Sequence, residues 1–322
     1  MALPDFIIIG APKAGSTALH AALAAHPDLW MSRVKEPKFF MCDGSPPRRE
    51  HQRGPGDAHS AQEWVWRRRD YEALFDGAPA GTLRGESTPL YLGDPMALER
   101  MAALVPDVKM IAIVRDPIDR AYSNWTHLWC DGLEPIGDFL AACDAEGGRV
   151  AAGWAPFWRY LGLGRYGEQL QRLLGHYPRQ QLHLLRYREL VDDPGGALDR
   201  ISAFLGVRTG MVGAAPPENM STWVDDTRLN QALQVAIRGG AAAGSYVPPQ
   251  IWRQASRPLL AALHRRHAVR PRLDLDVRAQ LLARVAPDVA LLESVTGESF
   301  GDWLSEQGRG AYALRKAPPR SA

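Results

Sequence analysis

The feature that most limits the possible folds is a glycine-containing turn between an apolar run and a helical stretch near the N-terminus. Residues 6–10 read Phe-Ile-Ile-Ile-Gly, a continuous apolar run that is typical of a parallel strand buried on both faces. The turn Ala11–Gly15 follows, and an Ala- and Leu-rich segment over residues 17–25 predicts a helix that ends before Pro27. A strand, a glycine turn and a helix in this order open α/β nucleotide-binding folds.

Three further segments predict the rest of a sheet. Met110–Val114 is a second clear buried strand, and residues 83–86 and 182–185 are shorter candidate strands. Helical patterns over about 118–128 and 194–205 follow two of these strands. We therefore predict an α/β fold with a central parallel sheet flanked by helices, in three layers.

No repeat or linker divides the sequence, so we expect a single domain over residues 1–322. Residues 43–62 carry Gly, Pro, Arg and His without periodicity and predict a surface loop insertion. Residues 207–250 are rich in Pro, Gly and Ala and predict an irregular region. Near the C-terminus we expect two helices, the second starting at Pro287, and a tail over residues 310–322.

Composition and charge exclude several classes of protein. The chain has 38 Lys and Arg residues against 36 Asp and Glu residues, so no whole-molecule field favours nucleic acid, and any anion site is local. Cys42, Cys130 and Cys143 form no CxxC pair, which predicts neither a disulfide framework nor a metal site. No apolar stretch reaches the ~20 residues of a membrane span, and no signal-peptide pattern opens the sequence. We expect a cytoplasmic protein.

Anion-binding chemistry is predicted for the turn Gly10-Ala11-Pro12-Lys13-Ala14-Gly15-Ser16-Thr17. Backbone N–H groups of such a turn, with a helix N-terminus behind them, form a cradle for phosphate. The turn is P-loop-like, but the nucleotide-hydrolase pattern has lysine directly after the second glycine, where this chain has Ser16. Lys13 lies inside the loop, where its charge can stabilise the atom that bridges a phosphate and its leaving group.

A second anion-binding group is predicted where the strand over residues 110–114 ends. Arg115 falls at the carboxyl end of that strand, which is where α/β folds bind ligands. Ser123 lies on the following helix, and a guanidinium with a hydroxyl suits a second phosphate. We expect Arg120 to be a structural residue held by a salt bridge.

These two segments together resemble the donor site of sulfotransferases that use 3'-phosphoadenosine-5'-phosphosulfate (PAPS). Lys35-Glu36-Pro37-Lys38-Phe39-Phe40 is similar to the Lys-Glu-Pro-x-Phe-Phe stretch of the heparan-sulfate-type branch, which many bacterial members share. Glu86-Ser87-Thr88-Pro89-Leu90-Tyr91 is similar to the Glu-x-[ST]-Pro-x-Tyr segment of that branch. Further matches are Tyr187–Leu190, Asp193-Pro194, Leu292-Glu293, Thr296-Gly297 and Trp303. The ordered set extends over nearly the whole chain.

The resemblance implies transfer of a sulfuryl group from PAPS to a hydroxyl or amine, without a metal. Lys13 would stabilise charge on the departing oxygen, and Glu36 would accept the proton of the acceptor. The donor-binding residues that it implies are Pro12, Lys13, Ala14, Gly15, Ser16 and Thr17 for the 5'-phosphosulfate, Arg115 and Ser123 for the 3'-phosphate, and Tyr187 for the adenine.

The role of Glu36 has an alternative. A carboxylate suits a general base if burial by Phe39 and Phe40 raises its pKa. A structural ion pair with Lys35 or Lys38 would explain the same residue without catalysis.

Three other assignments stay open. His20 and His26 are rival bases, because another sulfotransferase branch uses histidine. We expect His20 to be a surface or packing residue and His26 to mark the end of the first helix. Tyr187 fits a core tyrosine with a satisfied hydroxyl as well as an adenine contact.

One part of the family pattern is missing. The heparan-sulfate enzymes carry a Lys-Gly-Arg loop near the C-terminus that closes over the 3'-phosphate, and this sequence has none. Residues 207–250 are then a candidate acceptor site or 3'-phosphate lid. Within residues 217–230, the candidate substitutes are Asn219, Ser221 and Arg228.

Two other classes of function remain to be tested. A P-loop nucleotide kinase shares the strand–loop–helix opening, but it should have lysine after Gly15 and an acidic Mg²⁺ ligand where Arg115 stands. A non-catalytic nucleotide-binding protein on the same scaffold is the second alternative, although both Lys13 and Glu36 are present. We expect a small-molecule or carbohydrate acceptor and no nucleic-acid partner; the sequence leaves the acceptor and the oligomeric state open.

Overall fold

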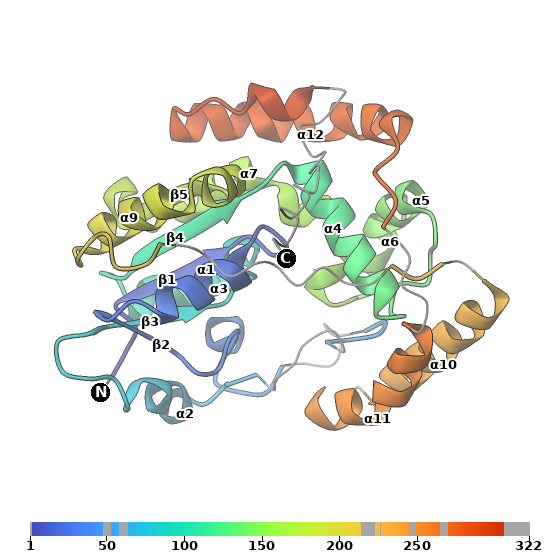
Figure 1. Cartoon of the computed structure of the whole chain (residues 1–322), viewed down its shortest axis with the longest axis horizontal. Coiled ribbons are helices and arrows are strands. Elements are labelled where there is room, and N and C mark those ends of the chain that lie inside the picture. The colour runs from blue at the N-terminus through green and yellow to red at the C-terminus, as the bar shows by residue number, and fades with distance from the viewer. Residues whose placement is uncertain are drawn as a thin grey trace, which may run out of the picture.

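A five-stranded sheet forms the centre of the molecule (Figure 1). Its strand order is β2-β3-β1-β4-β5, and every neighbouring pair is parallel. The strands are β1 (Phe6–Gly10), β2 (Leu29–Met31), β3 (Leu83–Ser87), β4 (Lys109–Val114) and β5 (Leu182–Arg186). The computed structural model describes residues 2–47, 53–57, 64–213, 223–225, 227–244, 249–264 and 270–305.

The central strands are apolar because helices cover both of their faces. All five residues of β1 are buried, and so is every residue of β4 after Lys109. Gly85 of β3 lies so close to β1 that a Cβ atom there would be 2.2 Å from the Phe6 ring, so no larger residue fits without a shift. The predicted central parallel sheet is confirmed.

Helices flank the sheet and complete the predicted three layers. Helix α1 connects β1 to β2, and α3 connects β3 to β4, which lies in the opposite direction across the sheet. Because both connections are right-handed, the two helices lie on opposite faces. In Figure 1, α12 lies along the outside of the molecule next to α7. The helices are α1 (Ser16–Ala24), α2 (Arg68–Glu72), α3 (Pro95–Leu104), α4 (Pro117–Cys130), α5 (Phe139–Asp144), α6 (Glu146–Ala151), α7 (Tyr166–Leu174), α8 (Tyr187–Asp192), α9 (Pro194–Leu205), α10 (Arg228–Gly244), α11 (Pro249–Leu263) and α12 (Leu275–Thr296).

A second apolar cluster lies beside the sheet, around α4 and α5. The hairpin of α10 and α11 packs against the C-terminal end of α4, where a Cβ atom at Gly132 would be 2.9 Å from Ile237. The Gln234 side chain donates a hydrogen bond to the Trp129 carbonyl (3.2 Å). This hairpin projects from the body of the molecule (Figure 1).

The expectation of an irregular region over residues 207–250 is wrong for residues 228–244 and 249–250, because α10 and the start of α11 lie there. Helix α10 forms because Leu233, Ile237 and Ala241 recur every four residues and face the α4 cluster. The high content of Ala and Gly obscured this spacing. Residues 214–222 and 245–248 lie outside the described residues.

The expected break at Pro287 is also wrong, since α12 continues through it from Leu275 to Thr296. Just after the proline, the Asp288 carboxylate accepts the backbone N–H groups of Gly167 and Glu168 at 2.9 and 3.0 Å. These bonds tie α12 to the start of α7, so tertiary packing overrides the local cost of the proline.

The segment over residues 43–62 is not simply a surface insertion. Its described part near Gly54 packs against Trp154, where a Cβ atom would be 2.5 Å from the indole, and Arg53 pairs with Trp154 in an isolated parallel bridge. Residues 48–52 and 58–62, and the predicted tail over 310–322, lie outside the described residues. The short edge strand β2 was not predicted.

Candidate functional site

The candidate site lies at the carboxyl ends of β1 and β4, where the strand order changes direction. The chain leaves β1 toward β2 on one side of the sheet and leaves β4 toward β5 on the other. A crevice outside the strands is expected at such a switch point, and it is the usual ligand site of open α/β sheets. The turn after β1 and Arg115 after β4 therefore lie side by side.

The turn over residues 11–15 has the backbone geometry of an anion cradle. Lys13 adopts a positive φ of 63° and Gly15 one of 97°, a left-handed conformation that few non-glycine residues adopt. Ala11 donates its N–H to the Ile113 carbonyl of β4 (2.7 Å), which fixes the start of the turn. At Gly15 a Cβ atom would be 2.8 Å from the Tyr187 ring, so glycine is required by space as well as by conformation.

The N-terminus of α1 opens onto this turn. Gly15 is its N-cap residue, and no side chain caps the first turn of the helix. Ser16 is buried and Thr17 is exposed, so their hydroxyl groups lie at different depths beside the uncapped N–H groups. Unpaired N–H groups together with the helix dipole favour an anion here.

Arg115 links the two halves of the candidate site. Its Nη1 donates to the Lys13 carbonyl (3.3 Å), and its guanidinium lies 4.8 Å from the centre of the Tyr187 ring. Tyr187 thus packs between the turn and Arg115 and also belongs to the buried core, so both interpretations of this residue stay open. Ser123 is half-buried on α4, two turns after Arg115.

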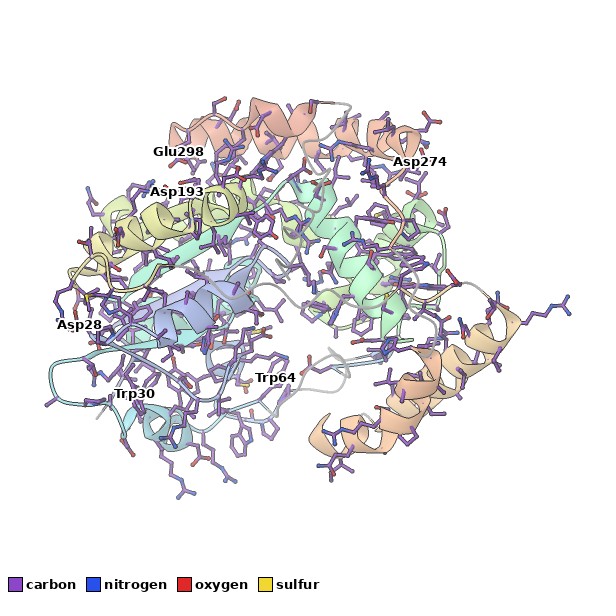
Figure 2. All side chains as sticks on the ribbon, in the orientation of Figure 1. Asp28, Trp30, Trp64, Asp193, Asp274 and Glu298 are labelled. Carbon is purple, nitrogen blue, oxygen red and sulfur yellow. The ribbon has the colours of Figure 1, made fainter. Side chains whose placement is uncertain are left out.

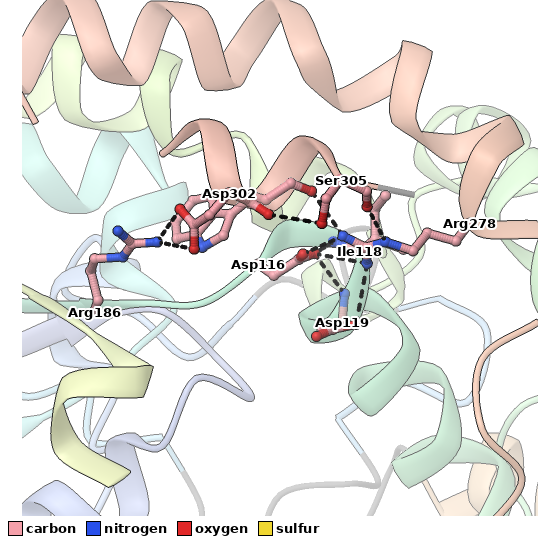
Figure 3. A network of polar contacts seen from close by, with 8 residues as sticks. Asp116, Ile118, Asp119, Arg186, Arg278, Asp302 and Ser305 are labelled. Atoms are coloured by element: carbon pink, nitrogen blue, oxygen red, sulfur yellow. Dashed lines mark hydrogen bonds and ion pairs between the residues drawn. The ribbon is translucent and has the colours of Figure 1, made fainter. Parts of the chain in front are cut away.

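The backbone next to Arg115 is held by a buried ion pair (Figure 3). Asp116 caps α4 by accepting the N–H groups of Ile118 and Asp119 at 2.9 and 3.1 Å. Arg278 of α12 contacts Asp116 at 2.5 Å and Asp119 at 3.3 Å, and its side chain is only 2% exposed. Asp116 is therefore paired with Arg278 of α12.

The same close-up shows how the C-terminal segment is anchored (Figure 3). Arg278 also donates to the carbonyls of Trp303 and Ser305 at 2.8 and 3.1 Å. Arg186, at the end of β5, contacts Asp302 at 2.5 Å. These bonds attach the segment after α12 to the carboxyl edge of the sheet.

Arg120 is structural, as predicted, but it is not held by a salt bridge. Its side chain is fully buried and donates to the carbonyls of Pro12 (3.4 Å) and Tyr160 and to the Asn124 side chain (3.0 Å). All three acceptors are neutral. Arg120 therefore supports the turn over residues 11–15 by donating to the backbone carbonyl of Pro12.

Glu36 lies on the segment after β2, next to the carboxyl end of β3. Its N–H donates to the Ser87 carbonyl (2.9 Å), and its φ of 62° is left-handed. Its carboxylate forms an ion pair with Lys35, and its side chain remains 31% exposed. The proposed structural pairing with Lys35 is thus present, whereas Lys38 pairs elsewhere.

Phe39 and Phe40 do not bury Glu36 fully, since 31% of its side chain is exposed. Phe39 stacks on Tyr71 at 4.1 Å between ring centres, and Phe40 packs edge-on against Tyr71 and Tyr91. Both phenylalanines anchor the segment in the core below the site.

Burial raises the pKa of the Glu86 carboxyl to about 7. It lies at the end of β3, fully buried, and accepts hydrogen bonds from the hydroxyls of Tyr71 (2.9 Å) and Thr88 (2.8 Å). The sequence marked Glu86 as part of a motif but not as a titrating group, because its depth depends on strand order.

Lys38 is an unusual buried cation. It is 1% exposed and contacts both oxygens of Asp57 at 2.9 and 2.8 Å. Trp64, labelled in Figure 2, donates its indole N–H to Asp57 (2.7 Å), and the Lys38 ammonium lies 5.1 Å from its ring centre. This ion pair attaches Asp57, in the segment over residues 43–62, to the part of the chain that carries Glu36.

The two histidines are placed differently. Burial, followed by the charge of Lys35, lowers the pKa of His20 to about 4, with Glu36 acting in the opposite direction. His20 is therefore close to Glu36 but is a weak base. His26 bonds to the Arg208 carbonyl (2.8 Å) and accepts the N–H of Asp28 (3.1 Å), consistent with its expected role at the helix end.

Within the described ranges, no three His, Cys, Asp or Glu side chains group together as ligands for a metal ion. Nor does any helix in the part of the chain that the structure describes have the length and apolar character to cross a membrane. Of the candidate substitutes for the missing loop, Asn219 and Ser221 lie outside the described residues, and Arg228 is exposed at the start of α10.

Comparison with known proteins identifies the class. A family model described as "Sulfotransferase family" matches residues 4–210, which include the anion turn, Glu36, Arg115, Ser123 and Tyr187. The chain therefore belongs to the sulfotransferase family, and the resemblance drawn from its motifs is confirmed.

Individual relatives sharpen this placement. The chain is 31% identical over 207 residues to heparan sulfate glucosamine 3-O-sulfotransferase 3B1 of Mus musculus, a match that covers 64% of this chain and 47% of that protein. It is 30% identical over 213 residues to the human bifunctional heparan sulfate N-deacetylase/N-sulfotransferase 2, covering 64% and 22%. The chain thus spans about half the length of the first relative and less than a quarter of the second.

A solved structure matches almost the whole chain. The crystal structure of a sulfotransferase from Alicyclobacillus acidocaldarius superposes with a TM-score of 0.71 at 28% identity and covers 95% of this chain and 100% of that one.

Proposed function

We propose that this sulfotransferase transfers the sulfuryl group of PAPS to a hydroxyl or amine of a small-molecule or carbohydrate acceptor. The observation that carries the proposal is the two-part anion site, in which Arg115 reaches from β4 to the Lys13 carbonyl of the β1 turn (3.3 Å). A donor with phosphate groups at both its 5' and 3' positions matches two adjacent anion sites. The family membership and the lysine in the turn point the same way.

The donor supplies an activated sulfuryl group, and the residues of the β1 turn hold it. The N–H groups at the start of α1 and the hydroxyls of Ser16 and Thr17 bind the 5'-phosphate. Lys13 stabilises the negative charge that develops on the oxygen between phosphorus and sulfur as the sulfur–oxygen bond breaks. A cation in that place does the work that Mg²⁺ does in kinases.

Glu36 acts on the other side of the reacting sulfur. The acceptor oxygen or nitrogen forms the new bond to sulfur, and its proton passes to the Glu36 carboxylate. Lys35 orients that carboxylate through their ion pair. The products are the sulfated acceptor and 3'-phosphoadenosine-5'-phosphate (PAP), so atoms and charge balance.

The names of the curated relatives bear on the class of acceptor. The curated relatives act, by their names, on glucosamine in heparan sulfate, and this makes a carbohydrate one reasonable class. A small-molecule acceptor is the other. Screening both classes with isotope-labelled PAPS, and detecting the added sulfate by mass spectrometry, would identify the acceptor.

The experiment that tests the proposal measures PAP release from PAPS with and without EDTA. We expect turnover with PAPS to persist in EDTA, because Lys13 supplies the positive charge. A P-loop kinase would instead consume ATP and stop on chelation. Turnover that collapses in EDTA and recovers with Mg²⁺ would contradict the proposal, and binding of PAP with no turnover of PAPS on any acceptor would favour a non-catalytic protein.

A further inference from the structure

The backbone that carries Glu36 adopts a conformation that other residues must hold. Glu36 has a φ of 62° and Lys38 a φ of 57°, so two of three consecutive residues lie in the left-handed region. Among the described residues, the only other non-glycine residue with a positive φ is Lys13 of the β1 turn. Non-glycine residues keep this conformation only where the surrounding structure enforces it. The contacts made by the segment Glu36–Lys38 therefore decide where the Glu36 carboxylate points.

Two hydrogen bonds attach this segment to the end of β3. The Glu36 N–H donates to the Ser87 carbonyl at 2.9 Å. The Lys38 N–H donates to the side-chain hydroxyl of Thr88 at 3.4 Å. Ser87 is the last residue of β3 and Thr88 follows it, so the central sheet fixes the N–H groups of both left-handed residues.

A second set of contacts comes from Asp57, Trp64 and Val65. The Val65 N–H donates to the carbonyl of Pro37, the middle residue of the segment, at 2.8 Å. Asp57 accepts the Lys38 ammonium with both carboxylate oxygens, at 2.9 and 2.8 Å. The indole N–H of Trp64, labelled in Figure 2, donates to the same carboxylate at 2.7 Å. All three residues of the segment are thus held, and Asp57 is where the Lys38 and Trp64 side chains meet.

The burial of Lys38 makes Asp57 necessary. The Lys38 side chain is 1% exposed and that of Asp57 14% exposed. A buried ammonium without a counter-charge is costly, so loss of the Asp57 charge would drive Lys38 toward water. Because Lys38 is itself one of the two left-handed residues, that movement would displace the backbone next to Glu36.

We propose that Asp57 is a positioning residue for Glu36. Its ion pair with Lys38 holds the left-handed backbone from which the Glu36 carboxylate accepts the proton of the acceptor. These contacts hold the backbone and the Lys38 side chain, whereas 31% of the Glu36 side chain stays exposed. The inference rests on the proposed function, and it gives a role to the segment over residues 43–62, which the sequence indicates only as a surface loop.

The test measures turnover and donor binding in the same variant. Asp57→Asn keeps the shape of the side chain and removes its charge. We expect kcat for transfer from isotope-labelled PAPS to the acceptor found in the screen to fall by about 10- to 100-fold, the scale for a catalytic group displaced by about 1 Å. The KM for PAPS and the PAP affinity from calorimetry should stay near those of the wild type. Asp70→Asn makes the same change at an exposed ion pair with Arg69 and should leave kcat unchanged.

A double variant separates positioning from general damage. If Asp57 acts through Glu36, Asp57→Asn should slow the wild type but should not slow Glu36→Gln further, because the base that it positions is already absent. Asp57→Glu keeps the charge and should recover part of the lost kcat. Trp64→Phe removes only the indole donor to Asp57, so it should lower kcat by a few-fold and provides the test if Asp57→Asn does not fold.

The outcomes distinguish this inference from the function on which it rests. An unchanged kcat in folded Asp57→Asn, or the same slowing in the wild type and in Glu36→Gln, would show that Asp57 does not position Glu36. A loss of PAP affinity in parallel with kcat would indicate a general structural role and overturn the proposal as well. A wild type that transfers the sulfuryl group of PAPS to no acceptor would instead remove the proposed function itself.

Discussion

The donor side and the acceptor side of the site are built in different ways. We define the donor side as residues 10–17 and 115–123, and the acceptor side as residues 35–42 and 53–57, after the roles proposed for them above. The donor side consists of the turns directly after two central strands, β1 and β4, and of the first residues of the helices that follow them, α1 and α4. The acceptor side consists of segments outside the strands, which are held in place by side-chain contacts.

Each side contains one buried ion pair, and the two pairs do different work. On the donor side, Arg278 contacts Asp116 at 2.5 Å and holds the backbone next to Arg115. On the acceptor side, Lys38 contacts Asp57 at 2.8 Å and ties two chain segments together. The first pair shapes a binding site that the strands already position, whereas the second creates local structure that no strand provides. Substitutions on the two sides should therefore separate donor binding from acceptor chemistry.

The largest expected effect lies on the acceptor side. Glu36→Gln keeps the shape of the side chain but cannot accept a proton, so turnover should fall by ~10²–10⁴ while PAP affinity stays near that of the wild type. His20→Ala is the matched test of the rival base and should change turnover little, because a pKa of about 4 makes His20 a weak base. Steady-state rates and calorimetry measure the two quantities. A variant at Glu36 that keeps more than about a tenth of the wild-type rate, with a slow His20→Ala, would reassign the base.

The two buried ion pairs give the next effect. Removing one partner of a buried pair leaves an uncompensated charge, so Arg278→Met and Lys38→Met should each lower the free energy of unfolding by about 3–5 kcal/mol. Only Arg278→Met should also weaken PAP binding in the folded protein. Urea unfolding and calorimetry measure both, and Arg284→Ala, which breaks the exposed pair with Asp144, should cost about 0–1 kcal/mol. Equal losses of PAP affinity in both methionine variants would remove the distinction between the two sides.

The difference between the sides explains how much the sequence could predict. The buried strands, the turn around Lys13 and the position of Arg115 follow from local patterns, because each residue is placed by the strand directly before it. The contacts of Lys38 with Asp57 and of Arg270 with Tyr122 join residues 19 and 148 positions apart in the sequence. Without the strand order and the packing of α12, nothing in the sequence indicates which distant residues meet.

A pH effect should come from Glu86, below the acceptor side. Burial raises its pKa from 4.5 to about 7, so the folded protein keeps a proton that the unfolded chain releases between these two values. The free energy of unfolding should therefore fall as pH rises through this window, and the contribution that is complete below pH 4.5 is lost above about pH 7. The size of this change is on the order of 3 kcal/mol.

Glu86→Gln cannot ionise and should remove that pH dependence. Relative to the wild type, Glu86→Gln should be more stable at about pH 8 than at about pH 5, because only the wild type loses stability as the pH rises. Glu99→Gln is the control, since Glu99 is exposed on α3 and should not change the profile. Parallel profiles for the wild type and Glu86→Gln in urea unfolding would show that Glu86 ionises normally in the folded protein.

The smallest expected effect belongs to Arg115 on the donor side. Arg115→Ala removes a charged hydrogen-bond donor from the site, so PAP binding should weaken by about 1.5–3 kcal/mol. The effect stays moderate because Ser123 and the N–H groups of the β1 turn remain. Arg188→Ala, at an exposed ion pair with Asp192 on α8, is the control and should leave PAP affinity unchanged. If Arg115→Ala left PAP affinity intact but slowed turnover as much as Glu36→Gln, Arg115 would act on the reacting groups, and the separation of donor side from acceptor side would not hold.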